Sequence, residues 1–335
     1  MKNLYKIMFS SSMMMGTLIA ISSNSWMSMW IGLEINLLSI IPLMSNIKNK
    51  MESEAAMKYF ITQAMASTIF LLAIIMMLSN KEMLSSLSIN SMIMDLAILT
   101  KMGAAPLHFW FPEVMEGLSW INSMIMLTWQ KIAPMVIFMY SNKPLMFMTS
   151  IIIMSMMISG LMGINQTSLR KILAYSSINH IGWMIGAMLT NQTLWMMYFI
   201  IYSMMTINIT AMLKMMSIFN VAQLINSMNK SKTIKIMFSL NFLSLGGIPP
   251  FIGFFPKWIT INNMIQSNLF MLTFIMIMMT LIALVFYMRI TFNSGIVTTS
   301  ESSNKKSMTT LNMIVISNFI VISMLTTCPM MISFI

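Results

Sequence analysis

The sequence is poor in charge. Charged residues make up 8% of its 335 positions, whereas about a quarter is usual in a soluble domain. Eight residues are acidic, and the 19 lysines and arginines lie mainly in short polar links between apolar runs. Cations in such links set the orientation of a membrane protein, so the net charge of +11 does not indicate a nucleic-acid-binding surface.

Cysteine, histidine and ligand-binding motifs are also scarce. The single Cys328 excludes a disulfide framework, and two histidines are too few for the paired axial ligands of a multi-haem cytochrome. Neither histidine has companions at metal-ligand spacing, and no Gly-rich phosphate loop or Ser-His-Asp set is present. We therefore expect this chain to bind no metal and no cofactor of its own.

Apolar runs of about twenty residues recur along the whole chain. This is the length that a helix needs to cross ~30 Å of hydrocarbon, and the alternating pattern of a membrane β-barrel is absent. The sequence predicts an all-α polytopic membrane protein that forms one membrane-embedded domain, residues 1–335, because the links are too short for another. We expect about eleven transmembrane helices at 3–23, 25–45, 58–79, 91–116, 119–140, 145–165, 168–189, 192–217, 236–262, 269–291 and 311–333.

The distribution of cations supports this topology. Fourteen cations fall on the side of the N-terminus, and Lys81 and Lys143 fall on the other, which is the bias expected for the matrix or cytoplasmic face. With an odd number of spans, the C-terminus lies on the opposite side. The fourteen are Lys2, Lys6, Lys48, Lys50, Lys58, Arg170, Lys171, Lys214, Lys230, Lys232, Lys235, Arg289, Lys305 and Lys306.

Four charges remain inside the predicted spans: Glu34, Lys101, Lys131 and Lys257. A charge at the centre of a membrane helix costs at least ~2.5–3.5 kcal/mol, so each needs a reason. One interpretation is structural, with side chains that reach an interface or form ion pairs. The other is a proton relay, because apolar surroundings favour the neutral amine of a lysine and a nearby carboxylate favours its charged form.

The remaining titratable residues are harder to assign. His108 and His180 are possible relay groups, but a single histidine in a span more often makes a hydrogen bond. Asp95, Glu113 and Glu116 lie toward the ends of their spans, where we expect them at the membrane edge. For Glu113 and Glu116, one helical turn apart, a solvated structural role and a proton-carrying role are both open.

Two of the predicted spans, near 91–116 and 236–262, are interrupted by glycine and proline. A shift of 144 residues aligns KMGAAPLHFWFPEV with LGGIPPFIGFFPKW, so that Gly103 and Pro106 match Gly247 and Pro250, with Pro249 beside the latter. The two segments are an odd number of spans apart and cross the membrane in opposite directions. This pattern is typical of an inverted repeat whose interrupted helices meet at an ion site, although chance similarity between two proline-kinked helices is the alternative.

Several long segments resemble one known family. WMSMWIGLEINLLSIIPLM, LTKMGAAPLHFWFPEVMEGLSW, LTWQKIAPM, LRKILAYSSINHIGWM and LSLGGIPPFIGFFPKW closely resemble the subunit 2 family of mitochondrial NADH:ubiquinone oxidoreductase, respiratory complex I, in insect-like form. The resemblance extends over nearly the whole chain. It implies an antiporter-like fold in which Glu34 and Lys101 form the controlling pair, Lys131 is the central relay lysine and Lys257 is the exit-side lysine.

The resemblance also implies a function and a location. We expect a proton-translocating subunit of the membrane arm in the mitochondrial inner membrane, with the N-terminus in the matrix and the C-terminus in the intermembrane space. NADH, FMN, iron–sulfur clusters and ubiquinone belong to other subunits, and the partners are membrane-arm subunits, including antiporter-like neighbours, and lipids. The alternatives are a self-contained cation/proton antiporter and a structural membrane scaffold.

Overall fold

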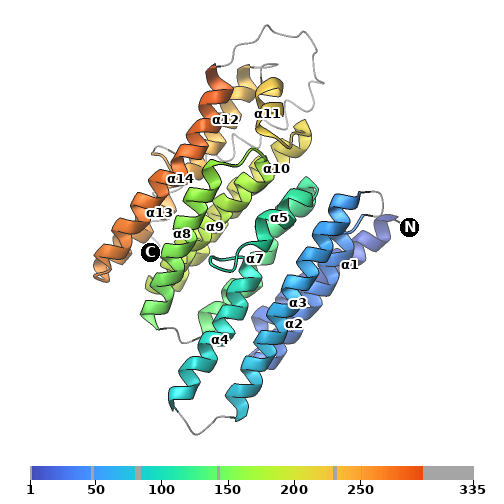
Figure 1. The fold of residues 1–335 in the computed structure, drawn as a ribbon, viewed down its shortest axis with the longest axis vertical. Helices are drawn as coiled ribbons and strands as arrows, with labels where there is room; N and C mark the ends of the chain where they lie inside the picture. Colours follow the sequence, from blue (N-terminus) through green and yellow to red (C-terminus); the bar gives the residue numbers. More distant parts are fainter. Residues whose placement is uncertain are drawn as a thin grey trace. The chain divides into compact units, whose positions relative to one another are not determined.

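A computed structural model describes residues 2–46, 49–79, 84–141, 144–228, 232–249 and 251–296. Within these ranges the chain is built from α-helices, with one isolated bridge between Ser168 and Asn220 (Figure 1). Seven of these helices are long and apolar enough to cross a membrane. The prediction of an all-α multi-pass membrane protein is confirmed, and the predicted last span, 311–333, lies outside the described residues.

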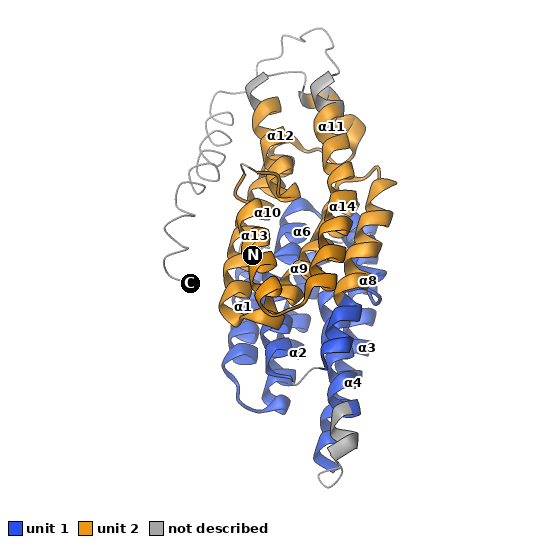
Figure 2. Cartoon of the chain, turned by 90° about the vertical axis from the view of Figure 1, so that its left-hand side faces the viewer, with its two compact units in different colours: residues 1–151 blue, residues 152–335 orange. Residues whose placement is uncertain are grey.

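The chain divides into two compact units, residues 1–151 and 152–335, which we describe separately (Figure 2). In the first unit, α2 packs against α1 and α3, α3 packs against α4 and α5, and α7 packs against α1, α2 and α4. The helices are α1 (Lys2–Ser22), α2 (Trp26–Met44), α3 (Lys50–Ser79), α4 (Leu84–Met102), α5 (Trp110–Gly117), α6 (Trp120–Leu127), α7 (Trp129–Tyr140) and α8 (Leu145–Ile164), which continues into the second unit.

In the second unit, α9 is buried along most of its length and contacts α10, α13 and α14. The helix α14 also packs against α11 and α12. The helices are α9 (Leu169–Thr190), α10 (Gln192–Met216), α11 (Val221–Met228), α12 (Lys232–Gly246), α13 (Phe254–Gln266) and α14 (Phe270–Ile296).

Both predicted interruptions are present, and they match in detail. The helix α4 ends at Met102 and α5 begins at Trp110, while α12 ends at Gly246 and α13 begins at Phe254, so both boundaries obey the 144-residue shift. Gly103 and Gly247 follow the two helix ends with φ of 73° and 75°. This left-handed conformation terminates a helix, and glycine adopts it without the steric cost of a Cβ atom.

Each interruption also contains proline. Pro106 follows a cis peptide bond in the first interruption, and Pro249 lies in the second. Pro250 lies outside the described residues.

Several helix boundaries differ from the prediction, among them the start of α4, which begins at Leu84 instead of residue 91. The helix α3 begins at Lys50 instead of residue 58, because KMESEAAMK is rich in good helix formers, and α11 lies where we expected a polar link. The predicted span 119–140 is divided at Thr128, whose φ of −115° departs from the helical value of about −63°. Pro134 lies further along, inside α7, where it cannot donate a hydrogen bond to the carbonyl of Gln130.

Candidate functional site

Lys101 lies one residue before the end of α4, where the chain closes the helix with its own backbone. The amides of Gly103 and Ala104 donate to the carbonyls of Thr100 and Leu99, at 3.2 and 3.1 Å. The indole Nε1 of Trp110 also donates to the Thr100 carbonyl, at 3.0 Å. These bonds satisfy the Leu99 and Thr100 carbonyls without the ammonium of Lys101.

Glu34 lies on α2, and its partly buried carboxylate interacts electrostatically with Lys101. In the part of the chain that the structure describes, no hydrogen bond or ion pair within 4.0 Å joins the two side chains. The structure therefore brings the predicted pair within electrostatic reach without direct contact. A pair of this kind responds to small displacements of either helix, because its interaction depends on distance.

A small cavity lies beside Lys101, between α2, α3, α4 and α7. It offers about 10 Å³ to the centre of a water molecule, which is room for about one. Sequence reasoning missed most of its polar lining, although an amide within an apolar span is itself a signal. The lining residues are Leu33, Asn36, Leu37, Tyr59, Gln63, Lys101, Gln130 and Pro134.

Two amides of this lining bind each other. The Asn36 Nδ2 donates to the Gln130 Oε1, and the Gln130 Nε2 donates to the Asn36 Oδ1, each at 3.0 Å. Asn36 lies two residues after Glu34, and Gln130 directly precedes Lys131. The amide pair therefore joins the helix of the carboxylate to the helix of the second lysine.

Lys131 is 2% exposed and lies in the first turn of α7, after the break at Thr128. Its Nζ lies 5.7 Å from the centre of the Phe111 ring, within the range of a cation–π interaction. Phe111 belongs to α5, directly after the interruption in which Gly103 lies. A Cβ atom on Gly103 would approach the Phe111 Cβ to 3.1 Å, so a larger residue here would press against the Phe111 side chain.

His108 is buried inside the first interruption, and its Nδ1 lies 3.2 Å from the Pro106 carbonyl. Because a carbonyl oxygen only accepts, this hydrogen bond requires the proton on Nδ1. The contact fixes the ring orientation, as expected for a hydrogen-bonding histidine, and a relay role stays a prediction.

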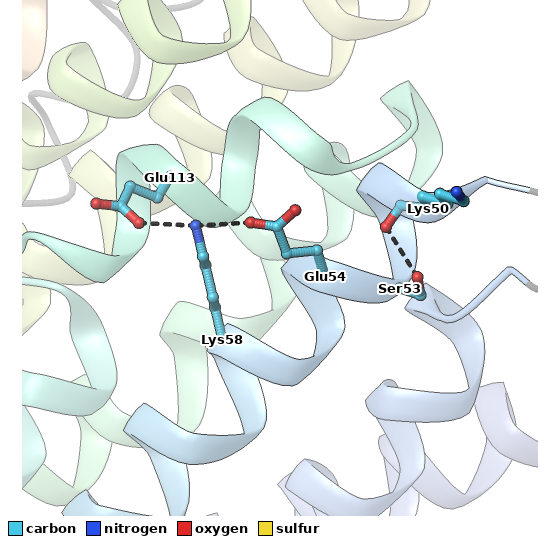
Figure 3. Close-up of polar contacts among 5 residues, drawn as sticks. All are labelled: Lys50, Ser53, Glu54, Lys58 and Glu113. Carbon is cyan, nitrogen blue, oxygen red and sulfur yellow. Dashed lines mark hydrogen bonds and ion pairs between the residues drawn. The ribbon is translucent and has the colours of Figure 1, made fainter.

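The acidic residues after the interruption lie at the surface of the unit. The Nζ of Lys58 lies 3.1 Å from carboxylate oxygens of both Glu54 and Glu113, and these side chains are about half exposed (Figure 3). Exposed pairs of this kind contribute little stability. Glu116 is partly buried, and the depth of both glutamates in the membrane stays a prediction.

Asp95 has a more buried setting than its expected place at the membrane edge suggests. Its side chain is fully buried, and Ser141, which follows the last residue of α7, donates its hydroxyl to the carboxylate. The contact ties the end of α7 to the middle of α4. Its depth in the membrane stays a prediction.

In the second unit, Lys257 closes the end of α12. It lies in the first turn of α13, is 7% exposed, and donates from Nζ to the Gly246 carbonyl at 2.8 Å. A Cβ atom on Gly247 would lie 2.8 Å from this Nζ, so glycine leaves the space that the lysine fills. The ammonium also lies 5.9 Å from the centre of the Trp183 ring.

His180 lies in α9 one turn before Trp183 and is also buried. Its Nδ1 lies 2.9 Å from the Tyr198 hydroxyl, and its ring packs against that of Tyr202, with centres 4.9 Å apart. The structure thus places His180 in an aromatic cluster that the sequence did not reveal. Among the described residues, no three His, Cys, Asp or Glu side chains gather as a metal ion would require.

A comparison with known families matches most of the chain. A family model described as "NADH:quinone oxidoreductase/Mrp antiporter, TM" matches residues 23–284. The protein named NADH-ubiquinone oxidoreductase chain 2 of Anopheles gambiae is 47% identical over 339 residues, which cover 97% of this chain and 99% of that protein. Its namesake from Locusta migratoria is 46% identical over 90% of this chain and 88% of its own length.

Solved structures share the fold at low identity. Respiratory complex I from Thermus thermophilus with bound aureothin contains a chain that superposes with a TM-score of 0.86 at 20% identity, over 96% of this chain and 78% of that one. The Mrp complex from Dietzia gives a TM-score of 0.73 at 16% identity, over 88% of this chain and 61% of that one. At these identities the likeness concerns the fold.

Proposed function

The chain belongs to the NADH-ubiquinone oxidoreductase chain 2 family, and from this premise we propose that it is a proton-translocating subunit in the membrane arm of a respiratory NADH:ubiquinone oxidoreductase. Electron transfer from NADH through FMN and iron–sulfur clusters to ubiquinone belongs to other subunits, and this chain carries protons. Its partners are neighbouring antiporter-like subunits and lipids of the mitochondrial inner membrane. In this proposal the chain has about eleven spans in one domain, related by an inverted repeat, with the N-terminus in the matrix and the C-terminus in the intermembrane space.

One observation carries the proposal: three lysines are almost fully buried within an apolar helical protein. Lys101, Lys131 and Lys257 are 8%, 2% and 7% exposed. Removing an ammonium from water is costly, so such groups persist where a function requires them. Two of the three adjoin helix interruptions, where polar backbone is tolerated at membrane depth because it lines a site.

The mechanism uses the geometry of the first unit. Conformational change that reaches this subunit from the redox domain alters the distance between Glu34 and Lys101, which interact without a direct ion pair. When the carboxylate moves away, the charged form of Lys101 loses support and its proton passes toward Lys131. Lys257 then releases a proton to the outer side. Moving one charge against 100 mV costs ~2.3 kcal/mol, and a lysine whose pKa changes by two units supplies about this amount.

The proposal is tested by Lys131→Met in the intact complex, because methionine keeps the length of the side chain and removes its charge. We expect normal assembly and NADH oxidation with a reduced number of protons moved per electron. Lys214→Met is the matched control, because Lys214 is an exposed lysine on α10 and is not one of the three buried lysines. An assembled Lys131→Met complex that pumps as well as the control contradicts the relay and favours a structural scaffold.

A second function, self-contained cation/proton exchange, is favoured by the family model, whose description includes an Mrp antiporter. It predicts that liposomes containing this chain alone exchange cations for protons. The subunit proposal predicts no exchange without the other subunits.

A further inference from the structure

Gln63 has a buried polar group that the proton relay does not use. It lies in α3, is 4% exposed, and lines the same cavity as Lys101. Its Nε2 has no hydrogen-bond partner among the described residues. A buried donor without an acceptor is unfavourable, so this amide calls for a partner that enters the cavity.

The nearby amides do not supply that partner. Asn36 and Gln130 bind each other through two hydrogen bonds, and this pairing fixes which atom of each amide faces the other. Each keeps one further lone pair and one further N–H for the cavity. The cavity therefore contains spare acceptors and donors, and it has room for about one water molecule.

We propose that Gln63 is a positioning residue that holds one ordered water against Lys101. The water accepts a hydrogen bond from the Gln63 Nε2 and another from the Lys101 Nζ. Both lone pairs of the water are then used, so its two O–H bonds point toward the amide pair formed by Asn36 and Gln130. Gln63 thereby orients the first water that meets the Lys101 ammonium.

This inference rests on the proposed function only where it concerns pumping. The position of the water is a separate matter, and a high-resolution density map of the intact complex tests it directly. We expect one ordered oxygen within hydrogen-bond distance of both the Gln63 Nε2 and the Lys101 Nζ. A well-resolved cavity without that oxygen, or one that a side chain fills, overturns the proposal.

Two substitutions separate orientation of the water from simple packing. Gln63→Met keeps the length of the side chain and removes the donor, and Gln63→Glu keeps the shape and replaces the donor with acceptor oxygens. We expect both variants to assemble and oxidise NADH, and both to lose as much of the proton-to-electron ratio as Lys101→Met. Each double variant with Lys101→Met should lose no more than Lys101→Met alone.

The outcomes distinguish the possible failures. If Gln63→Glu pumps normally, the Nε2 donor is not required and the positioning role is wrong. The role is also wrong if both variants pump like the control Gln192→Met, which changes an exposed glutamine at the start of α10. If Lys101→Met itself pumps normally, the proposed relay fails, while the density map still decides whether Gln63 holds the water.

Discussion

The two helix interruptions have the same length and begin with the same backbone turn, but they carry their lysines on opposite sides of the break. Each runs for seven residues and begins with a left-handed glycine, Gly103 in one and Gly247 in the other. Lys101 precedes its interruption, whereas Lys257 follows its own. The residue 144 positions before Lys257 is Glu113, which is exposed and paired with Lys58.

This difference determines what holds each ammonium. At the first interruption, the Trp110 indole caps α4, and Lys101 faces the cavity and the field of Glu34. At the second, Lys257 itself donates to the Gly246 carbonyl. The lysine at the first interruption thus lines a polar cavity, whereas the lysine at the second caps a helix. Matching helix breaks therefore do not assign equal roles to the charges beside them.

The largest expected effect is a loss of assembly, and it concerns the last residue of each interruption. This residue is Gly253 in the second interruption and Phe109 in the first. A Cβ atom on Gly253 would lie 1.7 Å from the Ser244 carbonyl oxygen, so Gly253→Ala requires the backbone to move. We expect the complex to lose most of its assembly, as measured on native gels. Phe109→Ala is the matched change, and it should assemble because this ring is 71% exposed. Normal assembly of Gly253→Ala would show that the close approach is not required.

A smaller effect distinguishes the two left-handed glycines. Gly103→Ala and Gly247→Ala meet similar backbone strain, about 1–2 kcal/mol. In Gly247→Ala the new methyl group also meets the Lys257 Nζ and Cδ, at 2.8 and 2.9 Å, so this lysine must leave the Gly246 carbonyl. We expect similar losses of thermal stability but a larger loss of protons per electron in Gly247→Ala. Equal pumping in the two variants would show that Lys257 does not need its hydrogen bond to the Gly246 carbonyl in order to function.

The indole cap of α4 has a modest expected effect. Trp110→Phe removes the hydrogen bond to the Thr100 carbonyl, which still accepts from the Gly103 amide. We expect a loss of about 0.5–1.5 kcal/mol of stability, read as a lower dissociation temperature of the complex. Trp258→Phe, at a partly exposed position of α13, is the control. A loss no larger than that of the control would exclude the cap as a stabilising contact.

The smallest effect is expected at Glu113, the counterpart of Lys257. Glu113→Gln removes one of two exposed ion pairs of Lys58, which keeps Glu54. We expect a change of stability below about 1 kcal/mol that disappears at high salt, and an unchanged proton-to-electron ratio. A reduced ratio would show that this position carries protons in both halves of the repeat.

Local features of the sequence predicted most of the fold. Hydropathy located the helices, and the shared Gly and Pro pattern located both interruptions, because these residues restrict the backbone wherever they occur. The break at Thr128 and the early start of α3 were not predicted, since they depend on weaker local preferences.

The candidate site was predicted only in part. Charges inside apolar spans identified Glu34, Lys101, Lys131 and Lys257. The cavity was not predictable, because its lining comes from four helices that meet only in the folded protein. The hydrogen bond from Lys257 to the Gly246 carbonyl was not predictable either, because it depends on how α13 packs against the end of α12.

The number of protons moved per electron by assembled complexes tests the central claim most directly, with Lys101→Met and Lys257→Met compared with Lys214→Met. The claim is that both interruption lysines carry protons although different contacts hold them. We predict that each of the two variants assembles, oxidises NADH and pumps fewer protons than the control. Pumping at the level of the control in either variant, with assembly intact, would contradict the claim for that lysine.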